Sequence, residues 1–323
     1  MNFYASDQYL SVVSDVYFPG RSTEVRTVLA NGSAFRLLFV DGRRYVTGAT
    51  FLDYHRPLET IAAARHDPSL RHVSPVAIRA VPLEDMPETD GATIGLAPFI
   101  DWSAFPNHED YVALLYRRNK GTFKEYDRRL RRLQELHGPV QFAFHDPQED
   151  VLPTAQAWKS SQLLRTGQTD YFADPANVRF FEVMRERGLL LASTLRVADR
   201  LVAVWLGFEY QGCLSGWIFA HDGGDEFRKF SVGHQLLRFM IAESHRRGHR
   251  EFDFSIGDED YKWLYASHVR LLGEAGIPAL TQQVRDLVVR SARQQVKKVP
   301  VLYRLLKAAA SRRGEARAAL PAR

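Results

Sequence analysis

The sequence contains a single cysteine, Cys213, and lacks long apolar runs. One thiol excludes an internal disulfide and is typical of proteins in a reducing compartment. The apolar stretch at residues 201–208 is far shorter than the ~20 residues of a membrane-spanning helix. Residues 1–18 lack the basic start and the apolar core of a secretory signal. We therefore expect a cytoplasmic protein.

Metal-binding patterns, repeats and low-complexity segments are also missing from the sequence. The 11 histidines show no zinc-type spacing with cysteine, so we predict no metal site. The composition is close to the globular average, with 45% hydrophobic and 25% charged residues. It excludes collagen-like, disordered and disulfide-scaffold proteins. A chain of 323 residues fits roughly one to two domains with a substantial core.

The net charge of +5 is concentrated in two segments. Residues 285–323 carry 11 basic and 2 acidic side chains, whereas the rest of the chain carries 32 basic and 36 acidic ones. Residues 117–132 form a second basic block with 8 basic and 2 acidic side chains. Because no recognition motif accompanies this charge, we expect no DNA partner.

Apolar periodicity predicts a mixed chain of helices and strands. In the first part, Ser6 is placed to cap a helix at residues 8–17. Residues 34–40 and 45–50 are predicted to form a hairpin. Two consecutive helices are expected to start at Asn107 and Thr122, each from a capping-box pattern.

From residue 140 onward the pattern is more regular. It predicts a strand, two helices, three successive strands, a helix, a strand, a short helix and a final strand. In that order these elements are 140–145, 153–164, 175–187, 189–197, 201–210, 213–220, 232–247, 251–254, a helix near 261, and 268–272. We divide the chain into a mixed α/β part at 1–139, a second unit at 140–279 and a basic amphipathic helical tail at 280–323.

The order of elements in 140–279 is similar to the GNAT fold of acyl-CoA-dependent N-acetyltransferases. Arg228 and Gly233 match the Gln/Arg-x-x-Gly-x-Gly/Ala signature of these proteins, whereas Ser231 replaces its first glycine. The residues Asp253-Phe254-Ser255-Ile256-Gly257 and then Tyr261-Lys262 resemble a motif of the CelD/BcsL-like branch. That branch is associated with cellulose and envelope polysaccharide synthesis and is related to the Fem peptidyltransferases.

The resemblance implies an α+β fold with a mixed central sheet flanked by helices. It also makes residues 1–139 a candidate degenerate GNAT-like half, which would give two tandem halves. It implies that acetyl-CoA or another acyl-CoA is a cosubstrate and that no cofactor is permanently bound.

The segment that starts the helix at residue 232 is the expected diphosphate site. A helix N-terminus offers unpaired N–H groups and positive dipole charge. Ser231 is expected to cap the helix, and Gly233 to let the backbone approach closely. The alternative is an ordinary capped helix after a solvated loop. The predicted cofactor-binding residues are Phe219, Arg228, Lys229, Ser231, Val232, Gly233, His234 and Gln235.

Four residues are the predicted catalytic groups under this resemblance. His221 and Asp253 are alternative general bases for the amine. Tyr261 would return a proton to the leaving thiolate, and Lys262 would stabilise charge. Because neighbours on a helix point about 100° apart, we expect Lys262 rather than Tyr261 to face the site. The structural alternatives are a surface histidine, a carboxylate bonded to backbone, and a packed tyrosine beside a solvated or salt-bridged lysine.

The resulting functional hypothesis is an acyl-CoA N-acyltransferase that transfers groups other than aminoacyl groups. Its acceptor would be an amine of an envelope precursor such as an amino sugar. The alternatives are a long-chain N-acyltransferase that acts on a lipid amine of the sphingoid-base kind, a Fem-like aminoacyl-tRNA-dependent ligase, and a non-catalytic GNAT-like binding module. The basic tail either packs on the protein or contacts an anionic membrane from the cytoplasmic side.

Overall fold

A computed structural model describes residues 3–30, 33–44, 51–57, 78–85 and 95–275. The predicted strand at 45–50 and the basic tail at 280–323 lie outside these described residues. Within the described part, no helix has both the length and the apolar character needed to cross a membrane.

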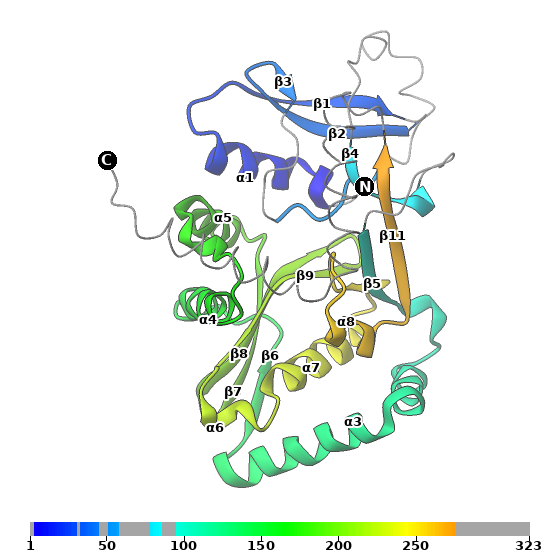
Figure 1. Ribbon diagram of the computed structural model, residues 1–323, viewed down its shortest axis with the longest axis vertical. Helices are drawn as coiled ribbons and strands as arrows, with labels where there is room; N and C mark the ends of the chain where they lie inside the picture. The colour runs from blue at the N-terminus through cyan, green and yellow to red at the C-terminus, as the bar shows by residue number, and fades with distance from the viewer. Residues whose placement is uncertain (1–2, 31–32, 45–50, 58–77, 86–94, 276–323) are drawn as a thin grey trace, which may run out of the picture.

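An eight-stranded sheet forms the centre of the molecule (Figure 1). Its strands β9 and β10 run parallel, and all its other neighbouring strands are antiparallel. This mostly antiparallel sheet, flanked by helices, confirms the predicted α+β fold class. The order across the sheet is β4 (Ile78–Pro82), β11 (His268–Ala275), β5 (Gly95–Asp101), β10 (Glu251–Asp253), β9 (Cys213–His221), β8 (Arg200–Tyr210), β7 (Leu191–Val197) and β6 (Val140–Ala143).

Strands from the first 139 residues complete this sheet. β5 lies between β10 and β11, and β4 pairs with the outer side of β11. The division proposed at residue 139 therefore separates two segments that share one sheet.

A smaller, three-stranded sheet contains β1 (Thr23–Ala30), β2 (Ser33–Val40) and β3 (Arg43–Arg44). It lies with the helix α1 (Asp7–Tyr17) at one end of the molecule (Figure 1). The Ser6 hydroxyl accepts the Tyr9 N–H at 3.2 Å, which confirms the predicted cap of this helix.

Helices cover both faces of the large sheet. On one face α3 (His108–His137) and α7 (Val232–Arg246) share an apolar core with residues of β7, β8, β9 and β10. On the other face α1, α4 (Val151–Arg165) and α5 (Pro175–Glu186) share an apolar core with residues of β7, β8 and β9. Every helix and strand predicted between residues 140 and 272 is present, with end positions that differ by a few residues.

The two helices predicted at Asn107 and Thr122 are a single element, α3, with a kink. Asn107 caps it as expected, but the break falls at Asn119, whose φ of −144° and ψ of 53° are not helical. Thr122 is already inside the helix. Leu115 and Phe123 on the two sides of the kink are buried in the same core, which keeps both segments on one face of the sheet.

Short helical segments connect these elements. Two of them are α6 (Asp225–Arg228), which precedes α7, and α8 (Asp260–Tyr265), which precedes β11. The 3-10 helices are η1 (Phe3–Ala5), η3 (Leu83–Asp85), η4 (Trp102–Ala104) and η5 (Tyr171–Ala173).

Candidate active site

A cleft opens where the parallel strands β9 and β10 part. They pair through three residues each, and the last pair is Ser215 with Asp253. Beyond it, β9 continues to His221, whereas the chain after Asp253 turns away toward α8. The cleft has a volume of about 510 Å³ and is lined by α4, β9, the start of α7 and residues 254–262.

Gly233 brings β9 against the first turn of α7. A Cβ at this position would lie 3.1 Å from Cζ of Phe219 and 3.2 Å from Cδ2 of His221, which is tighter than an ordinary contact. The absence of a side chain therefore lets the strand approach the helix N-terminus. The unpaired N–H groups of that first turn then face the cleft end where an anion is favoured.

Ser231 does not cap α7 with its side chain, contrary to the prediction. Its φ of 54° and ψ of 46° are left-handed, and its hydroxyl accepts the Arg129 Nη1–H at 2.6 Å. This backbone conformation favours glycine, which is the residue of the GNAT signature at this position. A serine there costs about 1 to 2 kcal/mol of conformational free energy.

The structure gathers most of the predicted cofactor-binding residues around one cleft and leaves two outside it. Gln235 points toward α3, where its Nε2 donates to the carbonyl of Tyr126 at 2.9 Å. Lys229 lies over the ring of Phe230, 5.1 Å from its centroid, and is absent from the cleft lining. Those that line the cleft are Phe219, Arg228, Ser231, Val232, Gly233 and His234.

His221 and His234 lie side by side at this end. The Nδ1 of His221 is 3.1 Å from the carbonyl oxygen of Asp222. His234 stacks on Tyr126 at 4.6 Å between ring centroids. Burial, together with the nearby His221 and Arg129, lowers the pKa of His234 to about 4. His234 is therefore neutral at neutral pH.

Lys262 fastens the loop at the other end of the cleft. It is 3% exposed, and its Nζ donates to the carbonyl of Ile256 at 2.7 Å and pairs with Glu259 at 2.9 Å. Gly257 has a φ of 138°, and a Cβ there would lie 2.8 Å from this Nζ. The glycine and the lysine of the motif are thus parts of one tight turn.

Tyr261 also lines the cleft, so the expectation that only Lys262 faces it is wrong. The short helix α8 lies along the cleft wall, and this orientation exposes two neighbouring side chains to the same space. The Tyr261 ring is 6.0 Å from that of Phe219. Burial raises the pKa of Tyr261, so its phenol stays protonated at neutral pH. Lys159 of α4 also lines the cleft, and burial lowers the pKa of its ammonium group.

A second, larger cavity of about 850 Å³ adjoins the same point of the sheet. Ser215 and Asp253 line this cavity, whereas the next residues, Gly216 and Phe254, line the cleft. This follows from the alternation of strand residues between the two faces of a sheet. The cleft and the second cavity therefore lie on opposite faces of the sheet at the point where β9 and β10 part.

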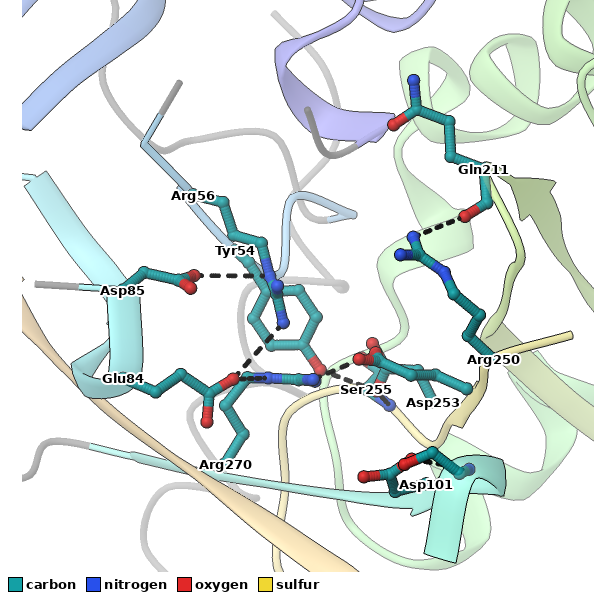
Figure 2. Close-up of polar contacts among 12 residues, drawn as sticks. Tyr54, Arg56, Glu84, Asp85, Asp101, Gln211, Arg250, Asp253, Ser255 and Arg270 are labelled. Carbon is teal, nitrogen blue, oxygen red and sulfur yellow. Dashed lines mark hydrogen bonds and ion pairs between the residues drawn. The ribbon is translucent and has the colours of Figure 1, made fainter. Parts of the chain in front are cut away.

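Paired charges line part of the second cavity, among them Arg56 and Asp85, whose contact Figure 2 shows. Arg270 is 1% exposed and pairs with Glu84 at 2.7 Å and with Glu251 at 3.0 Å. Arg56 pairs with the same Glu84 and with Asp85. These contacts tie η3 to β10 and β11 and hold the cavity wall in place.

Asp253 lies at the base of this second cavity and not in the cleft. It is 2% exposed, and its Oδ1 accepts the Tyr54 hydroxyl at 2.7 Å and the Ser255 N–H at 2.8 Å (Figure 2). Burial raises the pKa of Asp253, and Arg270 opposes this shift. The prediction left a catalytic and a structural role open, and these contacts are compatible with both.

Asp53 is a functional candidate that sequence reasoning missed. Its Oδ2 accepts the Ser255 hydroxyl at 2.6 Å and the Tyr4 hydroxyl at 2.7 Å. The Nε1–H of Trp217, a cleft residue, donates to the Tyr4 oxygen at 3.0 Å. Removal from water raises the pKa of Asp53 to about 6. Segment 51–57 has no periodic pattern or motif, so no local signal marks this carboxylate.

Comparison with known proteins agrees with the fold and with the cleft. Residues 120–263 match the family described as Acetyltransferase (GNAT) domain. This part of the chain is therefore a GNAT acetyltransferase-type domain, as the resemblance implied, whereas the CelD/BcsL-like branch stays a prediction. No curated protein matches the chain.

Two solved structures are similar over most of the chain. The crystal structure of FemX is 10% identical, covers 89% of this chain and 94% of its own, and has a TM-score of 0.56. A conserved protein of unknown function from Bacteroides thetaiotaomicron is also 10% identical, covers 86% and 92%, and has a TM-score of 0.52. At this identity the similarity shows the fold alone. Among the described residues, no group of three or more His, Cys, Asp or Glu side chains is arranged to hold a metal ion.

Proposed function

We propose that the protein is an acyl-CoA-dependent N-acyltransferase whose donor occupies the cleft between β9 and the start of α7. The observation that carries this proposal is the close approach of β9 to the first turn of α7 at Gly233, beside the point where β9 and β10 part. In such an arrangement one end of the cleft suits a diphosphate and the other offers unpaired strand backbone.

The donor would lie along β9. Its diphosphate would contact the N–H groups at the start of α7, with Arg228 supplying positive charge. Because β10 pairs with β9 only as far as Ser215, residues 217–219 have no β10 partner on that side. Their backbone groups are then available to the amide groups of the pantetheine arm. One N–H there would stabilise the oxyanion formed on the thioester carbonyl.

The acceptor would approach from the second cavity and attack the thioester carbonyl as a free amine. The nitrogen–carbon bond forms and the carbon–sulfur bond breaks. The Tyr261 phenol, which stays protonated, is suited to give its proton to the leaving thiolate. Lys262 would act by holding the loop of Ser255 and Ile256 in place.

An amine of an envelope precursor, such as an amino sugar, is the acceptor that we favour. The motif resemblance supports the class. The second cavity adds aromatic walls, which suit the flat faces of a sugar ring. These walls comprise Phe3, Tyr4, Tyr54, Trp102, Phe208 and Tyr210.

A Fem-like aminoacyl-tRNA-dependent ligase is the second candidate. The observation in its favour is the fold similarity to FemX over 89% of the chain. The basic block on α3 would then be an RNA contact. Several of its arginines already have partners within the protein, including Arg128 and Arg129 with Glu125.

Calorimetric titration with acetyl-CoA, longer acyl-CoAs and free CoA tests the proposed donor. We expect binding of acetyl-CoA, and Gly233→Glu should weaken it by about 100-fold or more, because the new carboxylate fills and repels the diphosphate site. Gly121→Glu is the matched control. Gly121 lies on α3, and a Cβ there would meet no atom within 4 Å.

The same titration separates the alternatives. Preference for a long acyl chain would favour a lipid-amine acyltransferase. Binding of charged tRNA without binding of any CoA compound would favour the Fem-like ligase. Absence of binding to all of these ligands would leave a non-catalytic module and would refute the proposal.

A further inference from the structure

Two carboxylates accept hydrogen bonds from Ser255, which lines the cleft, and one of them, Asp253, lines the second cavity. The Ser255 N–H donates to Asp253, and the Ser255 hydroxyl donates to Asp53. Figure 2 shows Ser255 beside Asp253. We propose that the Ser255 hydroxyl passes the proton of the acceptor amine to Asp53, with Asp253 and Tyr4 as positioning residues. This inference rests on the proposed acyltransfer.

Ser255 is positioned to reach a substrate in the cleft. It lies two residues after the last β9–β10 pair and lines the cleft. Its backbone is held in a left-handed conformation, with φ of 65°, by the bond from its N–H to Asp253. Strain of this kind is retained where the surrounding contacts hold it in place. Here those contacts direct the hydroxyl at Asp53.

His221 lies at the wrong end of the cleft to serve as this base. It contacts the Gly233 turn, where the diphosphate would bind. It lies five residues beyond Gly216, which corresponds to about 16 Å along β9. The reacting thioester lies far from the diphosphate in any acyl-CoA, so it would lie near Gly216 and Ser255.

The groups around Asp53 determine how readily it ionises. Lys262 favours its ionised form and Asp253 disfavours it, and the hydroxyl groups of Tyr4 and Ser255 also favour ionisation. Within the described part of the chain, neither Asp53 nor Asp253 forms an ion pair. Unpaired carboxylates shielded from water cost folding free energy, which is more typical of functional sites than of stabilising contacts.

The protons balance in the proposed step. As the amine nitrogen bonds to the carbonyl carbon, one N–H proton moves to the Ser255 oxygen, and the Ser255 hydroxyl proton moves to Asp53 Oδ2. The carbon–sulfur bond then breaks, and the thiolate takes the phenol proton of Tyr261. Asp53 releases its proton to solvent, and Tyr261 regains one from solvent.

The test measures thiol release from acetyl-CoA, with glucosamine as the acceptor probe and with water alone. Rates are measured between about pH 5 and pH 8. At neutral pH we expect Asp53→Asn and Ser255→Ala to lose about 100-fold or more in rate. Their acetyl-CoA affinity should stay within about 2-fold, because neither group contacts the diphosphate end. Asp15→Asn is the matched control, because this exposed carboxylate pairs with Arg187 and lines neither the cleft nor the second cavity.

The pH dependence separates a proton acceptor from a merely structural residue. The ratio of the wild-type rate to the Asp53→Asn rate cancels the titration of the amine itself. We expect this ratio to rise as the pH increases through about 6, where Asp53 becomes ionised. Partial recovery in Asp53→Glu would support the same role.

The outcomes are distinguishable. If the wild type binds acetyl-CoA and releases thiol, but Asp53→Asn keeps its rate and pH profile, the inference about Asp53 is overturned and the proposed function stands. If the wild type binds no acetyl-CoA, or releases no thiol with glucosamine or with water, the proposed function and this inference are both contradicted.

Discussion

At the scale of single residues, Asp53 shows how a site can depend on a carboxylate that stabilises the fold poorly. Its pKa is raised from 3.8 to about 6 because the surrounding protein shields it from water. A folded state with a raised acid pKa holds its proton more tightly than the unfolded chain does. Stability contributed by this group is therefore present at low pH and decreases as the pH rises from about 4 to about 6.

This sign leads to a prediction for Asp53→Asn. Asparagine imitates the neutral acid and can still accept from the Tyr4 and Ser255 hydroxyl groups. Relative to wild type, this variant should therefore be more stable, with a larger free energy of unfolding, at about pH 7 than at about pH 4. Urea denaturation of both proteins at the two pH values measures this difference. A difference in stability between the two proteins that does not change with pH would contradict the raised pKa of Asp53.

At the scale of elements, the start of α7 illustrates what sequence reasoning can predict and what it cannot. The helix and its first turn follow from a local signature, whereas the approach of β9 at Gly233 is seen only in the structure. The left-handed conformation of Ser231 was missed, because a serine before a helix normally indicates a side-chain cap. Only the contact with Arg129, 102 residues away in sequence, shows where its hydroxyl goes.

The strain at Ser231 can be measured with two variants. Ser231→Ala and Ser231→Gly both lose the hydrogen bond from Arg129, but only glycine is free of left-handed strain. We expect Ser231→Gly to be more stable than Ser231→Ala by about 1 kcal/mol or more in chemical denaturation. Equal stability of the two variants would show that this backbone conformation is not strained.

The strands themselves can be predicted from the sequence, whereas their order in the sheet cannot. Strands after residue 140 are predictable because each carries its own apolar alternation and is bounded by turn residues. The insertion of β5 between β10 and β11 depends on pairing with residues 150 or more positions away, which no local pattern encodes. The kink in α3 at Asn119, and not at Thr122, likewise depends on packing against the core.

At the scale of the whole molecule, the N-terminal part and the GNAT-type domain build the candidate site together. The motif residues Gly257, Tyr261 and Lys262 were predictable as members of a site. Asp53, Tyr4 and Tyr54 were not, because they reach Ser255 and Asp253 only through the tertiary fold. Contact of the acceptor with residues before 120 is therefore part of our account, although the matched domain begins there.

Hydrogen exchange with and without acetyl-CoA tests the central claim, which is the position of the donor. We predict slower exchange in three separate stretches that line one cleft, at residues 216–221, 228–234 and 254–262. The control region is the small sheet formed by β1 and β2, whose exchange should not change. Protection confined to other regions, or no protection by acetyl-CoA at all, would contradict the account.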